Sequence, residues 1–186
     1  MASIEHITSG LNVGPLTDQL ARHPEAWDRH TMRTEAYRTP HKGVSDIWVR
    51  YNAWENFHGD PQAFNSEHES VWYPVVADIP AAWSLARHVC RMVGGKLGGV
   101  LITRIPPGGE VKPHIDTGWH AQVHDKYAVQ VKGNGKQSFC FDDKRLHPMP
   151  GDLYTFDNSR RHWVTNDSDE ERITLIICIR RGSHAA

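Results

Sequence analysis

LGGVLITRIPPGGEVKPHID, residues 97–116, decides the fold class of this chain. A β-branched run at 97–105 ends in a Pro-Pro-Gly-Gly turn, and a second extended segment follows at 112–116. Further strand-like runs, separated by Gly-Asn-Gly and Pro-Gly-Asp turns, lie at 127–131, 137–141, 153–156, 162–165 and 172–180. Many short strands at this spacing predict a mostly β sandwich or barrel, here a jelly roll with helices packed against one side.

The amino-terminal half is more mixed. Residues 15–30 predict one or two short helices, with Pro15 at a helix start and a second proline interrupting the pattern. A strand is predicted at 44–51, and 52–79 has no sustained period, as in a long loop over a site. The strongest helix prediction is 80–94, which ends in two glycines. The apolar stripe of this helix contains Ala82, Leu85, Val89, Met92 and Val93.

Composition predicts a single domain. The chain has 186 residues, of which 39% are hydrophobic and 23% charged, enough for one well-packed core. We expect residues 1–95 to supply helices, a substrate-side strand and a lid loop, and residues 96–181 to form the metal-binding core. A net charge of −1 gives no general attraction to nucleic acids or anionic membranes. Neither a signal peptide nor a membrane span is evident, so a cytoplasmic location is expected.

His114 and Asp116 are two residues apart, so on an extended strand both side chains point to the same face. His162, which follows another turn and strand, can complete a 2-His-1-carboxylate triad, the donor set that holds non-haem Fe(II) and leaves positions open for a co-substrate and O2. This combination favours a metal centre over the alternative, a hydrogen-bonded surface network. The three cysteines contain no CxxC pair, which argues against a disulfide scaffold or a structural zinc site.

Arg172 opens the last strand-like run. It shares a face with Thr174, Ile176 and Cys178, whereas the isoleucines and the leucine between them share the other face. An arginine that faces into a barrel is costly unless an anion meets it, and a dicarboxylate co-substrate supplies that anion. The alternative is an ion pair at the rim with the acidic residues 169–171.

From about residue 99 to 180 the chain resembles the aspartyl/asparaginyl β-hydroxylase-like Fe(II)- and 2-oxoglutarate-dependent dioxygenases. The motifs that carry the resemblance are PPGGEVKPHID, GDLYTFDNSRRHWVTN and RITLIICIR. The resemblance implies a double-stranded β-helix, cupin-like in architecture, with His114, Asp116 and His162 as iron ligands. It further implies that Arg172 binds the distal carboxylate of 2-oxoglutarate, with Thr103 as a small hydroxyl residue near this co-substrate.

The chain departs from the family pattern at two places. Asp116 stands where members such as the vertebrate peptidyl hydroxylase have glycine, which makes the site similar to that of the free-proline hydroxylases of the family. The family's Arg-x-His pair is not evident, and one of His124, Lys126 or Tyr127 is predicted to contact the co-substrate instead.

These features predict an enzyme that hydroxylates a C–H bond of a carboxylate-bearing substrate, with release of succinate and CO2. A peptidyl Asp or Asn and a free amino acid both remain open as substrates. The alternative is a non-catalytic, cupin-like module that binds a metal or a ligand. Turnover of 2-oxoglutarate separates the two.

Substrate contacts are predicted on the strand at 44–51 and near Trp119. Trp48 and Arg50 lie on the polar face of this strand, opposite Ile47, Val49 and Tyr51. Arg50 is predicted to bind the substrate carboxylate. The loop 52–79 is predicted to act as a lid. His120 and His124 are four residues apart, but the context is not expected to be helical, so they are not predicted to bind a metal.

Overall fold

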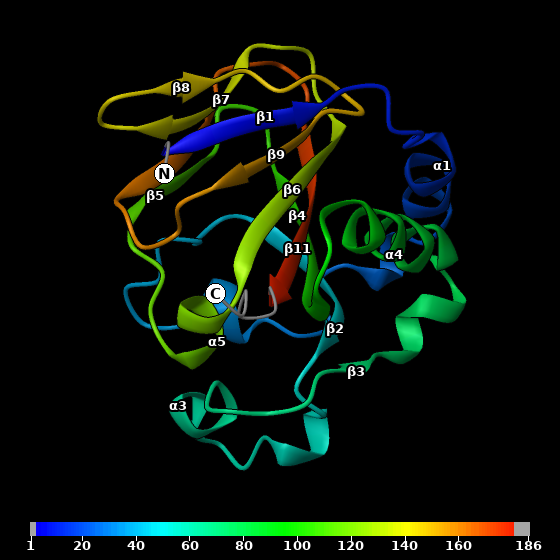
Figure 1. Cartoon of the computed structure of the whole chain (residues 1–186), viewed down its shortest axis with the longest axis vertical. Coiled ribbons are helices and arrows are strands. Elements are labelled where there is room, and N and C mark those ends of the chain that lie inside the picture. The colour runs from blue at the N-terminus through cyan, green and yellow to red at the C-terminus, as the bar shows by residue number, and fades with distance from the viewer. Residues whose placement is uncertain (1–2, 181–186) are drawn as a thin grey trace.

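Two antiparallel sheets face each other in the computed structural model, which describes residues 3–180 (Figure 1). Within that range the larger sheet has the order β1 (Ile4–Thr8), β9 (Leu153–Phe156), β6 (Asp125–Lys132), β11 (Arg172–Arg180), β4 (Lys96–Ile105), β2 (Ser45–Tyr51) and β3 (Val71–Trp72). The smaller sheet has the order β5 (Glu110–His114), β10 (His162–Asn166), β7 (Gln137–Phe141) and β8 (Arg145–Leu146). The mostly β jelly-roll prediction is confirmed.

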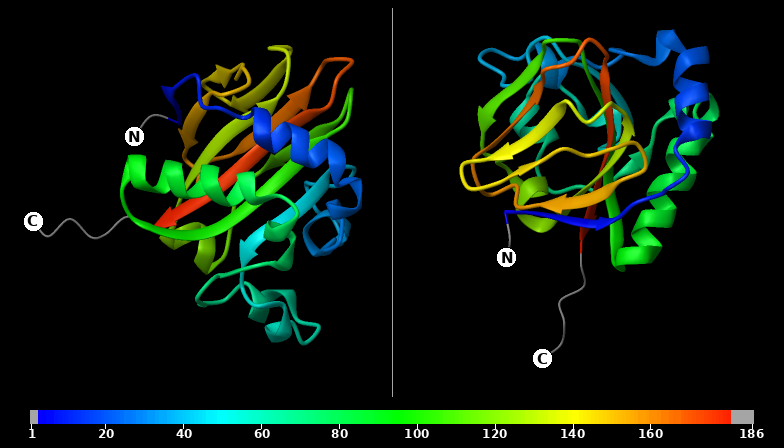
Figure 2. Two further views of the ribbon diagram at one scale, coloured as in Figure 1. Left: turned by 90° about the vertical axis from the view of Figure 1, so that its right-hand side faces the viewer. Right: turned by 90° about the horizontal axis from the view of Figure 1, so that it is seen from above.

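Helices α1 (Gly14–Arg22) and α4 (Pro80–Val93) pack together on the outer side of the larger sheet (Figure 2). Each helix has a proline in its first turn, where a backbone N–H has no acceptor within the helix, so the missing N–H of proline costs no hydrogen bond. α4 buries Ala82, Leu85, Ala86 and Val89, so most of the predicted stripe is confirmed. Met92 is the exception, because it is 45% exposed on the solvent side. Gly94 ends α4 with a φ of 77°, a conformation that favours glycine.

The two faces of β11 have different surroundings. Ile173, Leu175, Ile177 and Ile179 join the apolar core beneath the helices. Arg172, Thr174, Ile176 and Cys178 face the space between the sheets. The period-2 alternation predicted for this strand is therefore confirmed, and it gives the sheet one apolar and one functional face.

Several local features differ from the sequence predictions. β1, β3 and β8 are short strands that the pattern does not reveal. The predicted loop 52–79 contains, besides β3, only short helical turns: η2 (Trp54–Asn56), α3 (Pro61–Phe64) and η3 (Pro74–Ala77).

Three further short helical segments lie outside that loop. They are η1 (Pro24–Ala26), α2 (Met32–Glu35) and α5 (Trp119–Val123). α5 shows that the prediction of a non-helical context around His120 is wrong. Across residues 3–180, no helix has the length and apolar character that crossing a membrane requires.

Candidate active site and metal centre

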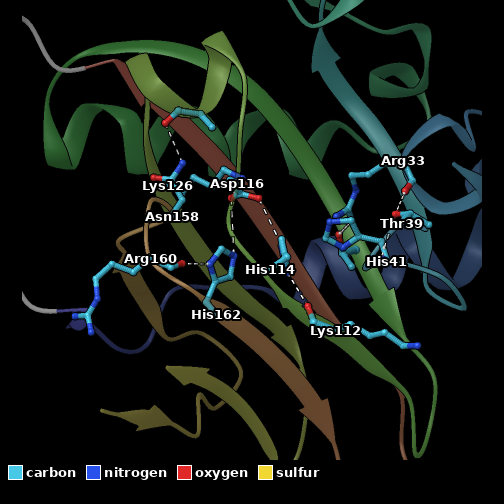
Figure 3. A network of polar contacts seen from close by, with 12 residues as sticks. Arg33, Thr39, His41, Lys112, His114, Asp116, Lys126, Asn158, Arg160 and His162 are labelled. Atoms are coloured by element: carbon cyan, nitrogen blue, oxygen red, sulfur yellow. Dashed lines mark hydrogen bonds and ion pairs between the residues drawn. The ribbon is translucent and has the colours of Figure 1, made fainter. Parts of the chain in front are cut away.

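His114, Asp116 and His162 converge at one end of the space between the sheets (Figure 3). His114 is the last residue of β5, His162 is the first of β10, and the two are paired across the strands. Asp116 Oδ1 lies 3.5 Å from His114 Nε2, and Asp116 Oδ2 lies 3.9 Å from His162 Nε2. One ligand atom from each residue lies within 4.8 Å of the others. This spacing fits a single cation bound by all three.

Backbone carbonyls fix the orientation of both imidazole rings. The Nδ1 atom of His114 lies 2.7 Å from the carbonyl oxygen of Lys112, and that of His162 lies 2.8 Å from the carbonyl oxygen of Arg160. A proton on Nδ1 completes each bond and leaves the Nε2 lone pair free to coordinate a metal. Such outer hydrogen bonds are usual for histidines that bind metals. The donor set of two imidazoles and one carboxylate therefore fits Fe(II).

Asp116 lies just beyond β5, yet the alternation continues, because Ile115 is 51% exposed and the carboxylate points inward. Its backbone N–H donates to the carbonyl of Asn158 at 3.1 Å. Lys126, on β6, forms an ion pair with Asp116 Oδ2. Burial alone would raise the pKa of Asp116, but the Lys126 ammonium and the two histidines hold that pKa well below its usual value. Lys126 is thus the member of the set His124, Lys126 and Tyr127 that reaches the triad.

A cavity of about 510 Å³ extends from the triad between the two sheets. Arg172 lines it, is 2% exposed, and donates from Nη2 to the hydroxyl of Tyr154 at 2.9 Å. Its Nε is buried without an acceptor, and none of the ion pairs among residues 3–180 includes it. Glu171 pairs with Lys132 instead, at 3.0 Å, so the alternative rim network does not involve Arg172. The cavity therefore contains a buried cation without a protein anion.

Thr103 also lines this cavity and is 4% exposed. Its hydroxyl donates to Asp46 at 3.1 Å and accepts from Arg33 at 2.9 Å. Arg33 and Asp46 are residues that the sequence reasoning missed as site components. The signal for Asp46 was its place on the polar face of β2, whereas nothing in the local sequence marks Arg33.

Three predicted site residues lie elsewhere. Tyr127 is 1% exposed and belongs to the apolar core. His124 and Trp119 line a separate pocket of about 280 Å³ and are not among the residues that line the main cavity. This placement does not agree with the predicted contacts of His124 and Tyr127 with the co-substrate, or with that of Trp119 with the substrate. His120 does face the main cavity, and its Nε2 accepts a hydrogen bond from the backbone N–H of Gly99 at 3.2 Å.

Trp48 and Arg50 both line the cavity, but Arg50 has hydrogen-bond partners that the prediction did not include. The pairing of β2 with β4 is irregular between these two residues, which breaks the alternation of side chains. Tyr51 consequently faces the cavity, with its ring 5.1 Å from that of Trp48. The terminal nitrogens of Arg50 donate to the carbonyls of Ser70 and Leu97. Arg50 therefore links the end of the long loop to β4.

Comparison with known proteins agrees with this geometry. The sequence model of the aspartyl/asparaginyl β-hydroxylase family matches residues 25–182. This chain belongs to that family. This hydroxylase is a member of the Fe(II)- and 2-oxoglutarate-dependent oxygenases, which use O2 as the second co-substrate. No curated protein matches its sequence.

Solved structures share the fold of this family member at low sequence identity. The viral collagen prolyl hydroxylase of Paramecium Bursaria Chlorella virus-1 has a TM-score of 0.56 at 13% identity, over 98% of this chain and 97% of that one. A prolyl-4-hydroxylase from Pseudomonas putida has a TM-score of 0.55 at 15% identity, over 97% and 94%. A 2OG-Fe(II) oxygenase family protein from Burkholderia pseudomallei has a TM-score of 0.53 at 14% identity, over 93% of each chain.

Proposed function

We propose that this hydroxylase inserts one oxygen atom into a C–H bond of a carboxylate-bearing substrate, a peptidyl Asp or Asn or a free amino acid. The other oxygen atom enters succinate as 2-oxoglutarate loses CO2. In this proposal His114, Asp116 and His162 bind the iron, and Arg172 binds the distal carboxylate of 2-oxoglutarate. The observation that carries it is a buried, anion-free guanidinium in the cavity that begins at the triad.

The side chains of the cavity have separate tasks. Arg172 and the Tyr154 hydroxyl offer hydrogen bonds to a carboxylate at the deep end. The apolar residues Ile105, Phe139 and Phe156 line the same space and exclude water from it. Bound Fe(II), together with 2-oxoglutarate, supplies the activation of O2 that C–H hydroxylation requires. The protein adds the fixed orientation of the two imidazoles and of the co-substrate.

The charges of the cavity favour an anionic prime substrate. Its lining contains the cations Arg33, Arg50, Lys126 and Arg172, and only Asp116 as an acidic residue. One further carboxylate, that of Asp46, lies behind Arg33. The charges of Fe(II) and of the 2-oxoglutarate dianion cancel, so the positive excess persists in the loaded enzyme. A substrate carboxylate reduces this excess, which supports the proposed substrate class.

Conversion of 2-oxoglutarate to succinate tests the proposal. Protein freed of metal is reloaded with Fe(II) without oxygen, exposed to air, and assayed by NMR for succinate. We expect succinate formation that depends on iron and is abolished by His162→Ala. The exposed His88, on α4, provides the matched control, and His88→Ala should retain full turnover. Absence of iron-dependent succinate from the unmodified protein contradicts the proposed chemistry.

A further inference from the structure

The guanidinium of Arg33 is fixed in the cavity wall by a buried partner. Its Nε donates to Asp46 Oδ2 at 2.8 Å, and its Nη2 donates to Asp46 Oδ1 at 2.7 Å and to the Thr103 hydroxyl at 2.9 Å. The Asp46 carboxylate is fully buried. The Thr39 hydroxyl also donates to the carbonyl of Arg33, at 2.6 Å, which holds the backbone of α2. The side chain therefore has little rotational freedom left to lose on binding a ligand.

One nitrogen of this guanidinium remains available. Nη1 has no acceptor among the residues that the structure describes, and it is not one of the buried atoms that lack a partner. Arg33 lines the main cavity, with its side chain 22% exposed. An arginine held by a carboxylate and a hydroxyl, with Nη1 still free, is a preorganised donor for a second carboxylate.

Arg33 lies on the side of the cavity near the iron ligand His114. The ring of His41 packs edge-on against that of His114, with centroids 4.9 Å apart. The carbonyl of Pro40 accepts a hydrogen bond from the backbone N–H of Lys112, on β5, at 2.9 Å. Figure 3 shows Arg33 and His41 next to each other, beside the triad. A molecule bound to Arg33 thus lies beside the proposed iron site. The hydrogen-bond partner of Arg33, Thr103, is paired across the strands with Thr174, two residues from Arg172, so Arg33 lies between the triad and Arg172.

The size and lining of the cavity indicate a small molecule. Its volume of about 510 Å³ equals that of roughly seventeen liquid water molecules, which accommodates 2-oxoglutarate and one further molecule of similar size. Trp48, Leu101 and Ile176 give this part of the cavity an apolar wall. The Tyr51 hydroxyl donates to Asn65 at 2.8 Å, so the long loop covers one side. The volume of the cavity matches a free amino acid beside the co-substrate.

We propose that Arg33 binds the α-carboxylate of a free amino acid with an apolar side chain, and that Asp46 acts as its positioning residue. This inference rests on the proposed hydroxylase function and adds the substrate class and the residue that selects it. Arg50, which the sequence favoured for this role, donates to backbone carbonyls instead.

The test measures binding without turnover. The protein is loaded with Mn(II) and N-oxalylglycine, a non-reacting analogue of 2-oxoglutarate. The probes are L-leucine, L-isoleucine, L-methionine and L-proline, each compared with its primary amide, which lacks the carboxylate. Paramagnetic broadening of the probe's proton resonances reports binding near the metal. We expect at least one amino acid to bind, and its amide to bind at least tenfold more weakly.

Variants then assign the carboxylate contact. Arg33→Gln should weaken binding of that amino acid at least tenfold and leave the affinity for 2-oxoglutarate within threefold. Arg33→Gln leaves the buried charge of Asp46 without a partner, which can unfold the protein. The double variant Arg33→Gln, Asp46→Asn removes both charges and therefore tests binding in a folded protein. Arg87, exposed on α4, provides the control Arg87→Gln, which should bind as the unmodified protein does.

Three outcomes contradict the inference. If none of the four amino acids binds to a protein that forms succinate, the substrate class is wrong while the hydroxylase function stands. If the double variant binds the amino acid with unchanged affinity, Arg33 is not the anchor. If Arg33→Gln weakens 2-oxoglutarate as much as the amino acid, Arg33 belongs to the co-substrate site. Failure of the proposed function itself is recognised separately, by absence of iron-dependent succinate.

Discussion

Replacing Arg172 by methionine should weaken 2-oxoglutarate binding by a factor of about 30 or more while leaving the fold intact. In the structure this guanidinium is 2% exposed and makes one hydrogen bond, to Tyr154, with no acidic partner. Loss of a buried charge pair between protein and ligand typically costs about 2–5 kcal/mol. At about 1.4 kcal/mol per factor of ten, even the lower value weakens 2-oxoglutarate roughly 30-fold.

The thermal stability of the protein provides the assay. With Mn(II) present and 2-oxoglutarate at 100 times its dissociation constant, ligand binding stabilises the unmodified fold by about 2.7 kcal/mol. For a domain of this size that corresponds to a rise in Tm of about 5–11 °C. A 30-fold loss of affinity reduces the stabilisation to about 0.9 kcal/mol and the rise in Tm to about 2–4 °C.

The ligand-free protein gives the second half of the measurement. A buried guanidinium without an anion contributes an uncompensated desolvation cost, so Arg172→Met should leave the free energy of unfolding equal or higher. Tyr154→Phe is the comparison variant, because it removes a hydroxyl and no charge. It loses the bond from Arg172 and the bond offered to the carboxylate, and it should weaken 2-oxoglutarate by about tenfold or less. An unchanged affinity for 2-oxoglutarate in Arg172→Met would refute the assignment of Arg172 to the distal carboxylate.

Three further predictions concern the metal, a close backbone contact and the long loop. Anaerobic Fe(II) titration should show one tight site that His114→Ala and His162→Ala abolish and that His88→Ala retains; full affinity in both triad variants would exclude them as ligands. Gly98→Ala should destabilise the fold by about 1–3 kcal/mol in urea unfolding, because an added Cβ would lie 2.4 Å from Nε2 of His124. Unchanged stability would show that the His124 ring is free to move away. Arg50→Gln should lower the free energy of unfolding and reduce substrate hydroxylation and uncoupled 2-oxoglutarate turnover alike, since its nitrogens bind two backbone carbonyls; selective loss of substrate hydroxylation would return it to the substrate site.

The strands and the triad could be predicted because their signals are local. Alternation along residues 172–180 shows directly which face is apolar, since side-chain direction depends only on the period of an extended strand. The same period places His114 and Asp116 on one side, and the boundaries of 137–141 and 153–156 agree with the structure. The helix at 80–94 was equally clear, apart from the exposure of Met92 at its end.

Only the tertiary structure decided which further groups surround the triad. The irregularity in β2 arises from its pairing with β4, and it turns Tyr51 toward the cavity and Arg50 toward the loop. Lys126 faces the triad because the register of β6 pairs it with Cys178 of β11, which lines the cavity. Tyr127 is paired with Ile177 and faces the apolar core.

The role of Arg33 was the hardest to predict from the sequence. Its partner Thr103 lies 70 residues away in the sequence, and its partner Asp46 lies 13 residues away with a turn between them. No periodic pattern encodes such a pair, because it forms only when the segment before β2 packs against the sheet. The sequence by itself therefore determined the alternating strands and the iron-binding pattern, whereas the packing of distant segments decided which cations face the cavity and which carboxylates they can still bind.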